Sequence, residues 1–218
     1  MTDRFYAIID DQTMIRFEPK SIVFDQGEEN FAWFEVIEGA LRLCRYLEDG
    51  TRHIDRFALA GDILGTNSEV YSASAETLQP TVLRRHALSG MDGEWLNAHA
   101  AQAIASLEQS VLLLRRPSAI QRIAAFIDRL VSRIGRGDIV DLPMSRVDIA
   151  DHLGLTPSTV SRSLGTLARM GIIETDGLHR ISAIDRRRLA LLGGLDDPSS
   201  LIVDRDDTRL FGLAGATL

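Results

Sequence analysis

Two kinds of apolar patterning divide the chain. From position 22 to about position 86, short runs rich in β-branched and aromatic residues are separated by Gly, Asp and Pro at intervals of roughly 8 to 12 residues. From about position 92 onward, apolar residues recur at helical spacing instead. Strands followed by helices predict an α+β chain, in which a β-sandwich or barrel precedes helical units.

Glycines stand between the β-prone runs. A turn that needs a positive φ angle favours glycine, because glycine has no Cβ atom to collide with the backbone. We therefore expect turns of this kind at Gly27, Gly39, Gly50, Gly61 and Gly65.

A helix with clear start and stop signals is predicted in the second half of the chain. Ser145 and Asp148 have the spacing of a capping box, in which each side chain bonds the backbone of the other residue. The helix should therefore run from about Arg146 to Leu153, and Gly154 should end it in the left-handed conformation.

A second helix follows after a three-residue turn. Thr156 before Pro157 is the pattern of an N-cap with proline at the first helical position, and Gly171 should close the helix. Two β-prone runs around Asp176-Gly177 then predict a hairpin. Helix, turn, helix and hairpin together indicate a winged helix-turn-helix, which is a DNA-reading unit.

The outward side chains of this unit are of types that bind DNA. Val160, Leu164 and Leu167 share one face of the second helix and should pack inward, and Arg162 could bind guanine O6 and N7 with two hydrogen bonds. The alternative is an ordinary packed unit whose serines are outside only because serine is polar. The predicted DNA-contacting residues are Ser145, Arg146, Thr156, Ser158, Thr159, Ser161, Arg162, His179 and Arg180.

Charge distribution supports a nucleic-acid partner, although the net charge of −7 argues against one. Counted over Asp, Glu, Lys and Arg, residues 1–114 carry −9, residues 115–190 carry +5 and residues 191–218 carry −3. Positive charge is thus concentrated around the predicted reading unit, as contact with phosphates requires.

The helix predicted from about position 92 carries an apolar stripe with alternating spacings of four and three, which is the spacing of a coiled-coil seam. The stripe could pack on the β-rich part. We favour a seam between two copies of the chain, because a helix-turn-helix usually reads two half-sites about 34 Å apart. The stripe consists of Ala100, Ile104, Leu107, Val111 and Leu114.

Two segments resemble the Crp/Fnr family of bacterial transcription regulators: LPMSRVDIADHLGLTPSTVSRSLGTLARMGII and, upstream, FEVIEGALRLCRYLEDGTRHIDRFALAGDILG. The resemblance covers roughly residues 17–192 and is strongest to the FixK-type branch, with weaker similarity to the nitric-oxide-responsive branch. It implies a double-stranded β-roll like that of cyclic-nucleotide-binding domains, a homodimer, a pseudo-palindromic DNA operator with TTGA-like half-sites and, for activation, contact with RNA polymerase.

The family comparison also implies a remnant of an effector pocket, formed by Gly61, Asp62, Gly65, Tyr71 and Ser72. Relatives that bind cyclic AMP neutralise its phosphate with an arginine followed by serine, whereas this chain has Tyr71 in the place of the arginine. Leu107 and Glu108 stand where small hydroxyl residues would face the adenine. Without the cation, a partly buried phosphate loses its charge-assisted partner, so we expect no cyclic nucleotide.

A second departure concerns DNA recognition. Most relatives have glutamate where Ser158 stands, and that glutamate accepts a hydrogen bond from cytosine N4. Ser161 and Arg162 match the family pattern. Serine cannot demand cytosine as a carboxylate does, so recognition of that base should be relaxed or changed.

The remaining composition limits cofactors and location. Cys44 is the only cysteine, which excludes an internal disulfide and the cysteine cluster of oxygen-sensing relatives, and the five histidines are scattered. We expect no metal and no cofactor, although a haem ligand set from distant positions stays open. No apolar run approaches the ~20 residues of a membrane span, and the first ten residues lack a signal-peptide pattern, so a cytoplasmic protein without membrane contact is expected.

The predicted organisation is a β-roll effector-type domain (residues 1–91), a dimerisation helix with a hinge (92–116), a winged helix-turn-helix domain (117–192) and an acidic tail (193–218). The preferred function is a DNA-binding regulator that needs no ligand. An effector-dependent sensor for haem, nitric oxide or another small ligand is the alternative within the family. A regulatory module of an enzyme, or a winged-helix interaction protein, is less favoured, because no catalytic motif remains.

Overall fold

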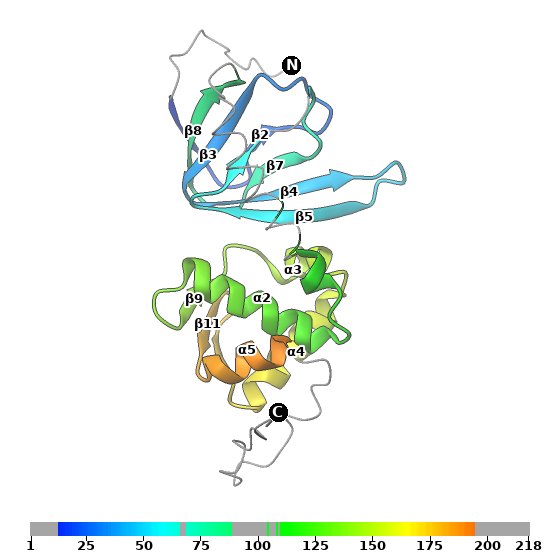
Figure 1. Ribbon diagram of the computed structural model, residues 1–218, viewed down its shortest axis with the longest axis vertical. Coiled ribbons are helices and arrows are strands. Elements are labelled where there is room, and N and C mark those ends of the chain that lie inside the picture. The colour runs from blue at the N-terminus through cyan, green and yellow to red at the C-terminus, as the bar shows by residue number, and fades with distance from the viewer. Residues whose placement is uncertain (1–12, 66–68, 89–103, 105–107, 109, 195–218) are drawn as a thin grey trace, which may run out of the picture.

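The computed structural model describes residues 13–65, 69–88, 104, 108 and 110–194. Figure 1 shows a β-roll stacked on a helical unit, with the β4–β5 hairpin lying along the junction. The strands of the β-roll are β1 (Met14–Phe17), β2 (Ile22–Phe24), β3 (Ala32–Glu38), β4 (Ala40–Tyr46), β5 (Arg52–Leu59), β6 (Ile63–Leu64), β7 (Ser74–Thr77) and β8 (Thr81–Ala87).

The β-roll consists of two antiparallel four-stranded sheets, with strand orders β1-β8-β3-β6 and β2-β7-β4-β5. A core that includes the fully buried Leu41, Leu64 and Leu83 lies between them. The predicted β-prone runs are confirmed as strands. The short β1 and β6 were not predicted, since β1 is a four-residue edge strand in which exposed and partly buried side chains alternate and β6 has only two residues.

All five predicted glycine turns have positive φ angles, between 80° and 101°. Gly39 shows the additional steric reason for glycine. A Cβ atom there would lie 2.4 Å from the Thr81 hydroxyl oxygen and 2.7 Å from the Pro80 carbonyl oxygen. The tight turn between β3 and β4 thus has no room for a side chain.

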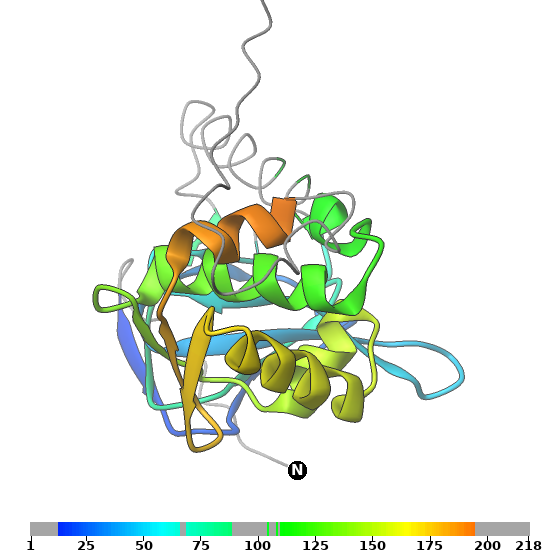
Figure 2. The same cartoon turned by 90° about the horizontal axis from the view of Figure 1, so that it is seen from below.

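The helical unit contains the two helices predicted from their caps. Figure 2 shows α5 lying along α2, with α4 and the hairpin on the other side of α2. Strands β10, β11 and β9 form a small antiparallel sheet in that order. The elements are α2 (Ala119–Ile134), β9 (Ile139–Asp141), α3 (Arg146–Leu153), α4 (Pro157–Arg169), β10 (Ile173–Asp176), β11 (Arg180–Ala183) and α5 (Arg186–Gly194).

Helix α5 extends past the expected end of the winged helix-turn-helix domain at residue 192. Gly193 and Gly194 both belong to the helix. A Cβ atom on Gly193 would lie 2.8 Å from the Cα atom of Ala125 in α2. Glycine is therefore needed here for close packing of two helices, and it does not mark the helix end.

The two units share one apolar core across their junction. Cys44, Ile54 and Phe57 of β4 and β5 belong to the same buried cluster as Ile123 and Ile127 of α2. Strands β4 and β5 are therefore covered on both faces, by the interior of the β-roll on one side and by the helical unit on the other. Within the described residues, no helix is long and apolar enough to cross a membrane.

Candidate nucleic-acid interface

The local signals that predicted the helix-turn-helix are confirmed. The Asp148 carboxylate accepts hydrogen bonds from the Ser145 backbone N–H at 3.1 Å and from the Ser145 hydroxyl at 2.7 Å, and the Asp148 N–H donates back to the hydroxyl at 3.1 Å. Gly154 follows α3 with φ 62° and ψ 43°. The Thr156 hydroxyl caps α4 by accepting from the Thr159 N–H at 3.2 Å.

Helix α4 has a buried apolar face and a polar outer face, as predicted. Val160, Leu164 and Leu167 are buried, whereas Ser158 and Arg162 are exposed. Among the described residues, the Arg162 guanidinium donates to its own helix alone, to the Ser158 carbonyl at 3.4 Å and the Thr159 hydroxyl at 3.3 Å. No carboxylate among the described residues forms an ion pair with it. Arg162 is thus an outward cation held against the first turns of α4.

The other predicted contact residues are already engaged within the protein. Arg146 donates to the Ser161 hydroxyl at 3.1 Å and links α3 to α4, and its Nε is buried. Arg180 on β11 forms an ion pair with Asp141 on β9, with Nε 2.8 Å from Oδ1. The His179 ring nitrogen Nδ1 lies 3.1 Å from the Leu142 carbonyl oxygen. Sequence reasoning missed these pairings, because only the sheet register places Arg180 opposite Asp141.

Ion pairs that the sequence did not predict join the inner side of α3 to the β-roll. Arg42 on β4 bonds both Asp148 and Glu76, the latter with Nη2 2.9 Å from Oε2. Arg52 on β5 donates from Nε to Asp151 at 3.1 Å and from Nη2 to Asp148 at 3.3 Å. This junction cluster fixes the position of α3, and therefore of the adjoining α4, on the β-roll.

The junction cluster shifts the acidity of its members. Burial acts to raise the pKa of Asp148, but the hydrogen bonds from Ser145 and the charge of Arg42 outweigh it and lower the pKa. Burial lowers the pKa of His152, which lies on α3 near the rings of Phe57 and Phe126. The His152 Nδ1 lies 3.1 Å from the Ile54 carbonyl oxygen. A neutral ring that carries its proton on Nδ1 can donate a hydrogen bond to this carbonyl.

The expected effector-pocket remnant is occupied by protein side chains. Tyr71 is buried, its ring stacks on Phe24 at 3.9 Å between centroids, and its hydroxyl donates to the Ala32 carbonyl at 2.8 Å. A Cβ atom on Gly65 would lie 2.9 Å from the Tyr71 ring. Asp62 pairs with Arg133 at 2.9 Å. The aromatic side chain in the arginine's place is therefore part of the β-roll core.

Two further predictions concern the apolar stripe and the cysteine. Ala100 and Leu107 of the stripe lie outside the described residues, while Ile104, Val111 and Leu114 are 58%, 47% and 43% exposed. Cys44 is buried, and burial raises the pKa of its thiol. In the described part of the chain, no group of three His, Cys, Asp or Glu residues is arranged to hold a metal ion.

Comparison with known proteins places this geometry in a family. The Crp-like helix-turn-helix domain matches residues 121–192, and the cyclic nucleotide-binding domain matches residues 14–91. The nitrogen fixation regulation protein FixK of Bradyrhizobium diazoefficiens is 34% identical over 82% of this chain and 81% of its own. The transcriptional activatory protein AadR of Rhodopseudomonas palustris is 35% identical over 76% of each chain.

A solved structure supports the same relationship. The structure of FixK2 from Bradyrhizobium japonicum superposes with a TM-score of 0.78 and 32% identity, covering 83% of this chain and 96% of that chain. The two matched domains are the β-roll and the winged helix-turn-helix described above, and the relatives are regulators, not enzymes. The chain belongs to the Crp/Fnr family of DNA-binding transcription regulators and has FixK-type proteins among its relatives.

Proposed function

We propose that this regulator binds a pseudo-palindromic operator as a homodimer and does so without a cyclic nucleotide. The observation that carries the proposal is the placement of Arg162, which is exposed on α4 and has no carboxylate partner among the described residues. A guanidinium placed this way can donate two hydrogen bonds to guanine O6 and N7 in the major groove.

The predicted contacts divide into base-reading and phosphate-binding groups. Arg162, Ser158 and Thr159 are on the first turns of α4, where side chains reach base edges. Ser161 supports the reading helix through its bond to Arg146. The remaining residues, Ser145, Arg146, Thr156, His179 and Arg180, would contact the DNA backbone, and Arg180 would contribute less because Asp141 neutralises it.

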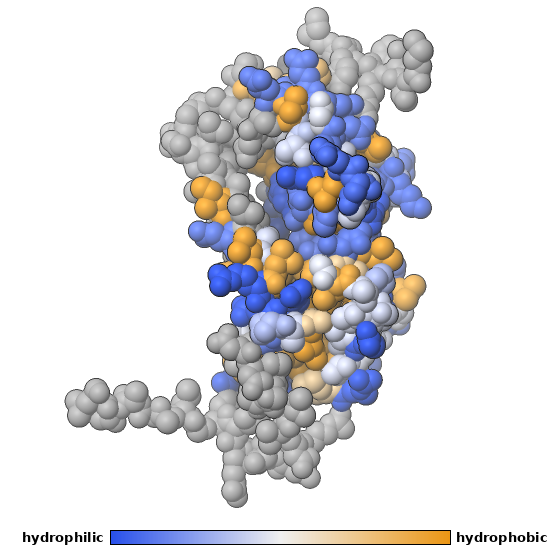
Figure 3. Space-filling view, turned by 90° about the vertical axis from the view of Figure 1, so that its right-hand side faces the viewer, coloured by the Kyte–Doolittle hydropathy of each residue, from blue (hydrophilic) through white to orange (hydrophobic). Residues whose placement is uncertain are grey.

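Dimerisation is supported by apolar side chains that the monomer leaves uncovered. Ile104, Val111 and Leu114 belong to the predicted stripe and are exposed, whereas Leu113 between them is buried. On the face seen in Figure 3, hydrophobic residues gather over the helical unit and near its junction with the β-roll. The β-roll itself is mostly hydrophilic on this face. Pairing the stripe with that of a second copy would bury these side chains and give a dimer with two reading helices, one for each half-site.

Independence of cyclic nucleotides is supported by the core role of Tyr71. Its hydroxyl donates a hydrogen bond to the Ala32 carbonyl and its ring stacks on Phe24. This neutral side chain offers no cation to a phosphate. Activation through contact with RNA polymerase, in the cytoplasm where the operator lies, is the corresponding proposal for the regulatory output. It rests on the likeness to relatives whose names describe activators.

The test is selection of bound DNA from a random duplex pool by the purified protein with no added ligand, with Arg162→Ala as the matched variant. We expect enrichment of a two-fold-symmetric sequence by the wild-type protein and markedly weaker enrichment by the variant. Enrichment that appears only after cyclic AMP is added would contradict ligand independence. The absence of enrichment under both conditions would contradict operator recognition itself.

A further inference from the structure

Helix α4 contains a glycine that packing within the protein does not explain. Gly165 lies in the interior of the helix, where glycine is less favourable than alanine because it loses more backbone freedom on folding. Apart from its chain neighbours and the helix backbone around it, no atom of the described residues lies within 4 Å of a Cβ atom built at Gly165. The described fold therefore has room for a side chain at this position, in contrast to Gly193 of α5.

Gly165 belongs to the outer face of α4. Successive residues of an α-helix are about 100° apart, which places Gly165 within about 60° of Ser158, Arg162 and Arg169 around the helix axis. These three residues are exposed, and Gly165 is partly exposed. The buried apolar face of the helix, described above, points the other way. The missing side chain is thus a gap in the surface proposed to read DNA.

Two cations flank this gap along the helix. Arg162 precedes Gly165 by three residues, and Arg169 follows it by four. Each arginine donates to a threonine hydroxyl one turn earlier, Arg162 to Thr159 at 3.3 Å and Arg169 to Thr166 at 2.9 Å. In the part of the chain that the structure describes, no carboxylate forms an ion pair with either arginine. Both guanidinium groups are therefore outward cations held against their own helix.

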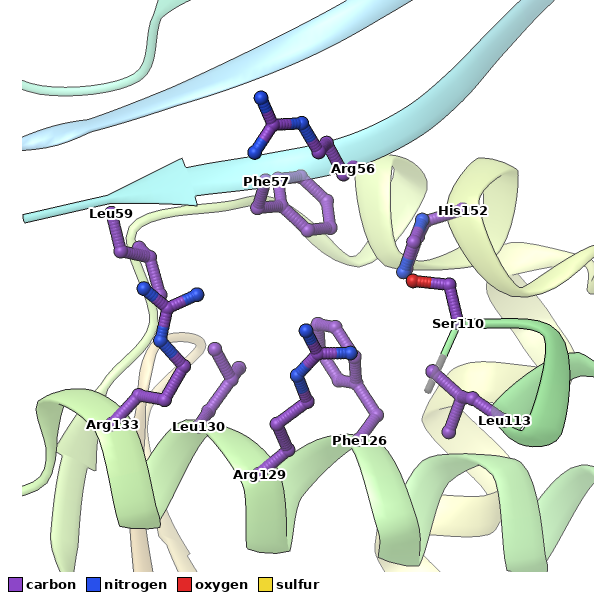
Figure 4. A pocket seen from close by; sticks show the side chains of 10 residues that line it. All are labelled: Arg56, Phe57, Leu59, Ser110, Leu113, Phe126, Arg129, Leu130, Arg133 and His152. Atoms are coloured by element: carbon purple, nitrogen blue, oxygen red, sulfur yellow. The ribbon is translucent and has the colours of Figure 1, made fainter. Parts of the chain in front are cut away.

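Arginines that face the β-roll are used differently. Figure 4 shows Arg133 extending from α2 toward β5, on the wall of a small cavity between the two. It forms an ion pair there with Asp62 at 2.9 Å. Arg56 lines the same cavity and donates to the Ile63 carbonyl at 2.8 Å. These two cations have partners within the fold, whereas those beside Gly165 face outward.

The spacing along α4 matches the dimensions of DNA. The rise of about 1.5 Å per residue puts Gly165 about 4.5 Å and Arg169 about 10 Å beyond Arg162 along the axis. The major groove is about 12 Å wide, so the sugar-phosphate backbone lies about 6 Å from its centre. For a helix that crosses the groove with Arg162 at the base edges, Gly165 lies beside this backbone and Arg169 reaches it from the far side.

We infer that Gly165 and Arg169 form a seat for one phosphate of the DNA backbone, in which Gly165 provides the clearance and Arg169 the charge. An α-helix with its side chains is about 10–12 Å in diameter and fills the groove, so the missing side chain allows a closer approach. Guanidinium groups form strong charge-assisted hydrogen bonds with phosphate oxygens. The inference rests on the proposed recognition of DNA by α4 and adds a contact that fixes the position of the helix without reading the sequence.

The charge of the seat is tested by Arg169→Gln. Fluorescence anisotropy measures binding of the full chain over a range of KCl concentrations, to the duplex enriched in the selection described above and to a duplex of scrambled sequence. Loss of a phosphate contact should reduce the steepness of log affinity against log salt concentration by about 1 per chain. Affinity should fall by the same factor for both duplexes, because a phosphate contact carries no sequence information.

The matched control is Arg84→Gln, whose arginine is ion-paired with Glu35 on the β-roll at 2.8 Å. It should leave the salt dependence unchanged. Arg169 also ends α4, where a cation interacts favourably with the helix dipole. A role limited to that interaction would lower stability in Arg169→Gln while leaving the salt dependence as in the wild type, and would overturn the seat.

The clearance is tested by Gly165→Ala and Gly165→Leu. Alanine should raise the melting temperature by about 2–4 °C, because it removes the cost of glycine in a helix interior. The same substitution should lower operator affinity at least about 5-fold, because an added side chain overpacks a closely fitted contact. Leucine, also a good helix former, should lower affinity further. A purely structural role of position 165 would move stability and affinity in the same direction.

The outcomes separate the seat from the proposed function. An unchanged salt dependence in Arg169→Gln would overturn the seat, and is the result expected if Arg169 binds an acidic protein partner instead of DNA. Wild-type affinity in Gly165→Leu would overturn it as well. Equal binding of the enriched and scrambled duplexes by the wild type would instead contradict operator recognition, and the salt dependence on the scrambled duplex would still test the seat. No binding of either duplex by the wild type would contradict both.

Discussion

The two helices of the helix-turn-helix use their charged side chains in opposite ways. On α3, Asp148 and Asp151 form ion pairs with Arg42 and Arg52 of the β-roll. On α4, the hydrogen-bond partners that Arg162 has in the described part of the chain all belong to its own helix. Both helices begin with an N-cap side chain that bonds the backbone, so helix formation does not explain the difference.

The contrast shows that helix formation depends on local sequence, whereas the availability of a charged side chain to an outside partner depends on tertiary structure. Capping satisfies backbone groups within three or four residues and makes both helices form. Whether a charge on a helix stays available to an outside partner depends on what the fold places opposite it. Arg162 faces outward and stays available, whereas Arg180 of the same unit is neutralised by Asp141.

The largest expected effect is a loss of stability when the ion pairs between α3 and the β-roll are broken. Asp148→Asn removes the charge that holds two arginines, and its carboxylate is only 5% exposed. Breaking a buried ion pair costs about 3–5 kcal/mol, and we expect the lower end because the arginines are partly exposed. Urea unfolding measures this change. Asp176→Asn, on the exposed hairpin, is the control and should change stability little; equal effects would contradict the role of the junction cluster.

The proposed contact between α4 and DNA is tested by Arg162→Ala. Operator affinity should fall by about 1–3 kcal/mol, since a guanidinium that binds one guanine is lost. The unfolding free energy should stay unchanged, because no ion pair is broken. Fluorescence anisotropy with operator DNA measures the affinity. Arg180→Ala is the comparison variant and should reduce operator affinity less. A larger loss of affinity than for Arg162→Ala would show that the ion pair with Asp141 does not neutralise Arg180 toward DNA.

Ser158→Glu should change specificity while leaving overall affinity for the best site similar. The introduced carboxylate can accept a hydrogen bond from cytosine N4, which should add about 1–3 kcal/mol of preference for cytosine at one base position. Competition between duplexes that differ at that base measures the preference. An unchanged preference would show that Ser158 does not face the base expected from the family pattern.

The smallest expected effect is a pH dependence of stability at the junction. The pKa of His152 is lowered by folding, so between this value and the unfolded value near 6.5 the unfolded chain binds more protons. Stability should therefore decline as the pH falls below about 6.5. His152→Gln should reduce this decline in urea unfolding between pH 7.5 and about 5.5. An unchanged decline would assign it to other groups.

The sequence was sufficient where the physical cause is short-ranged. The bounds of α3 were predicted from Ser145 and Gly154, and the start of α4 from Thr156 and Pro157, because each cap bonds the backbone within a few residues. The glycine turns of the β-roll were predicted for the same reason. Edge strand β1 was missed, since it has only four residues and none of its side chains is fully buried.

What only the tertiary structure decided is which charges meet. Arg42 and Asp148 are 106 positions apart, and Arg52 and Asp151 are 99 apart. Their pairing depends on the docking of α3 against β4 and β5. Local sequence determines the two helices through backbone hydrogen bonding. The electrostatic balance around them depends on distances through space that no local pattern encodes.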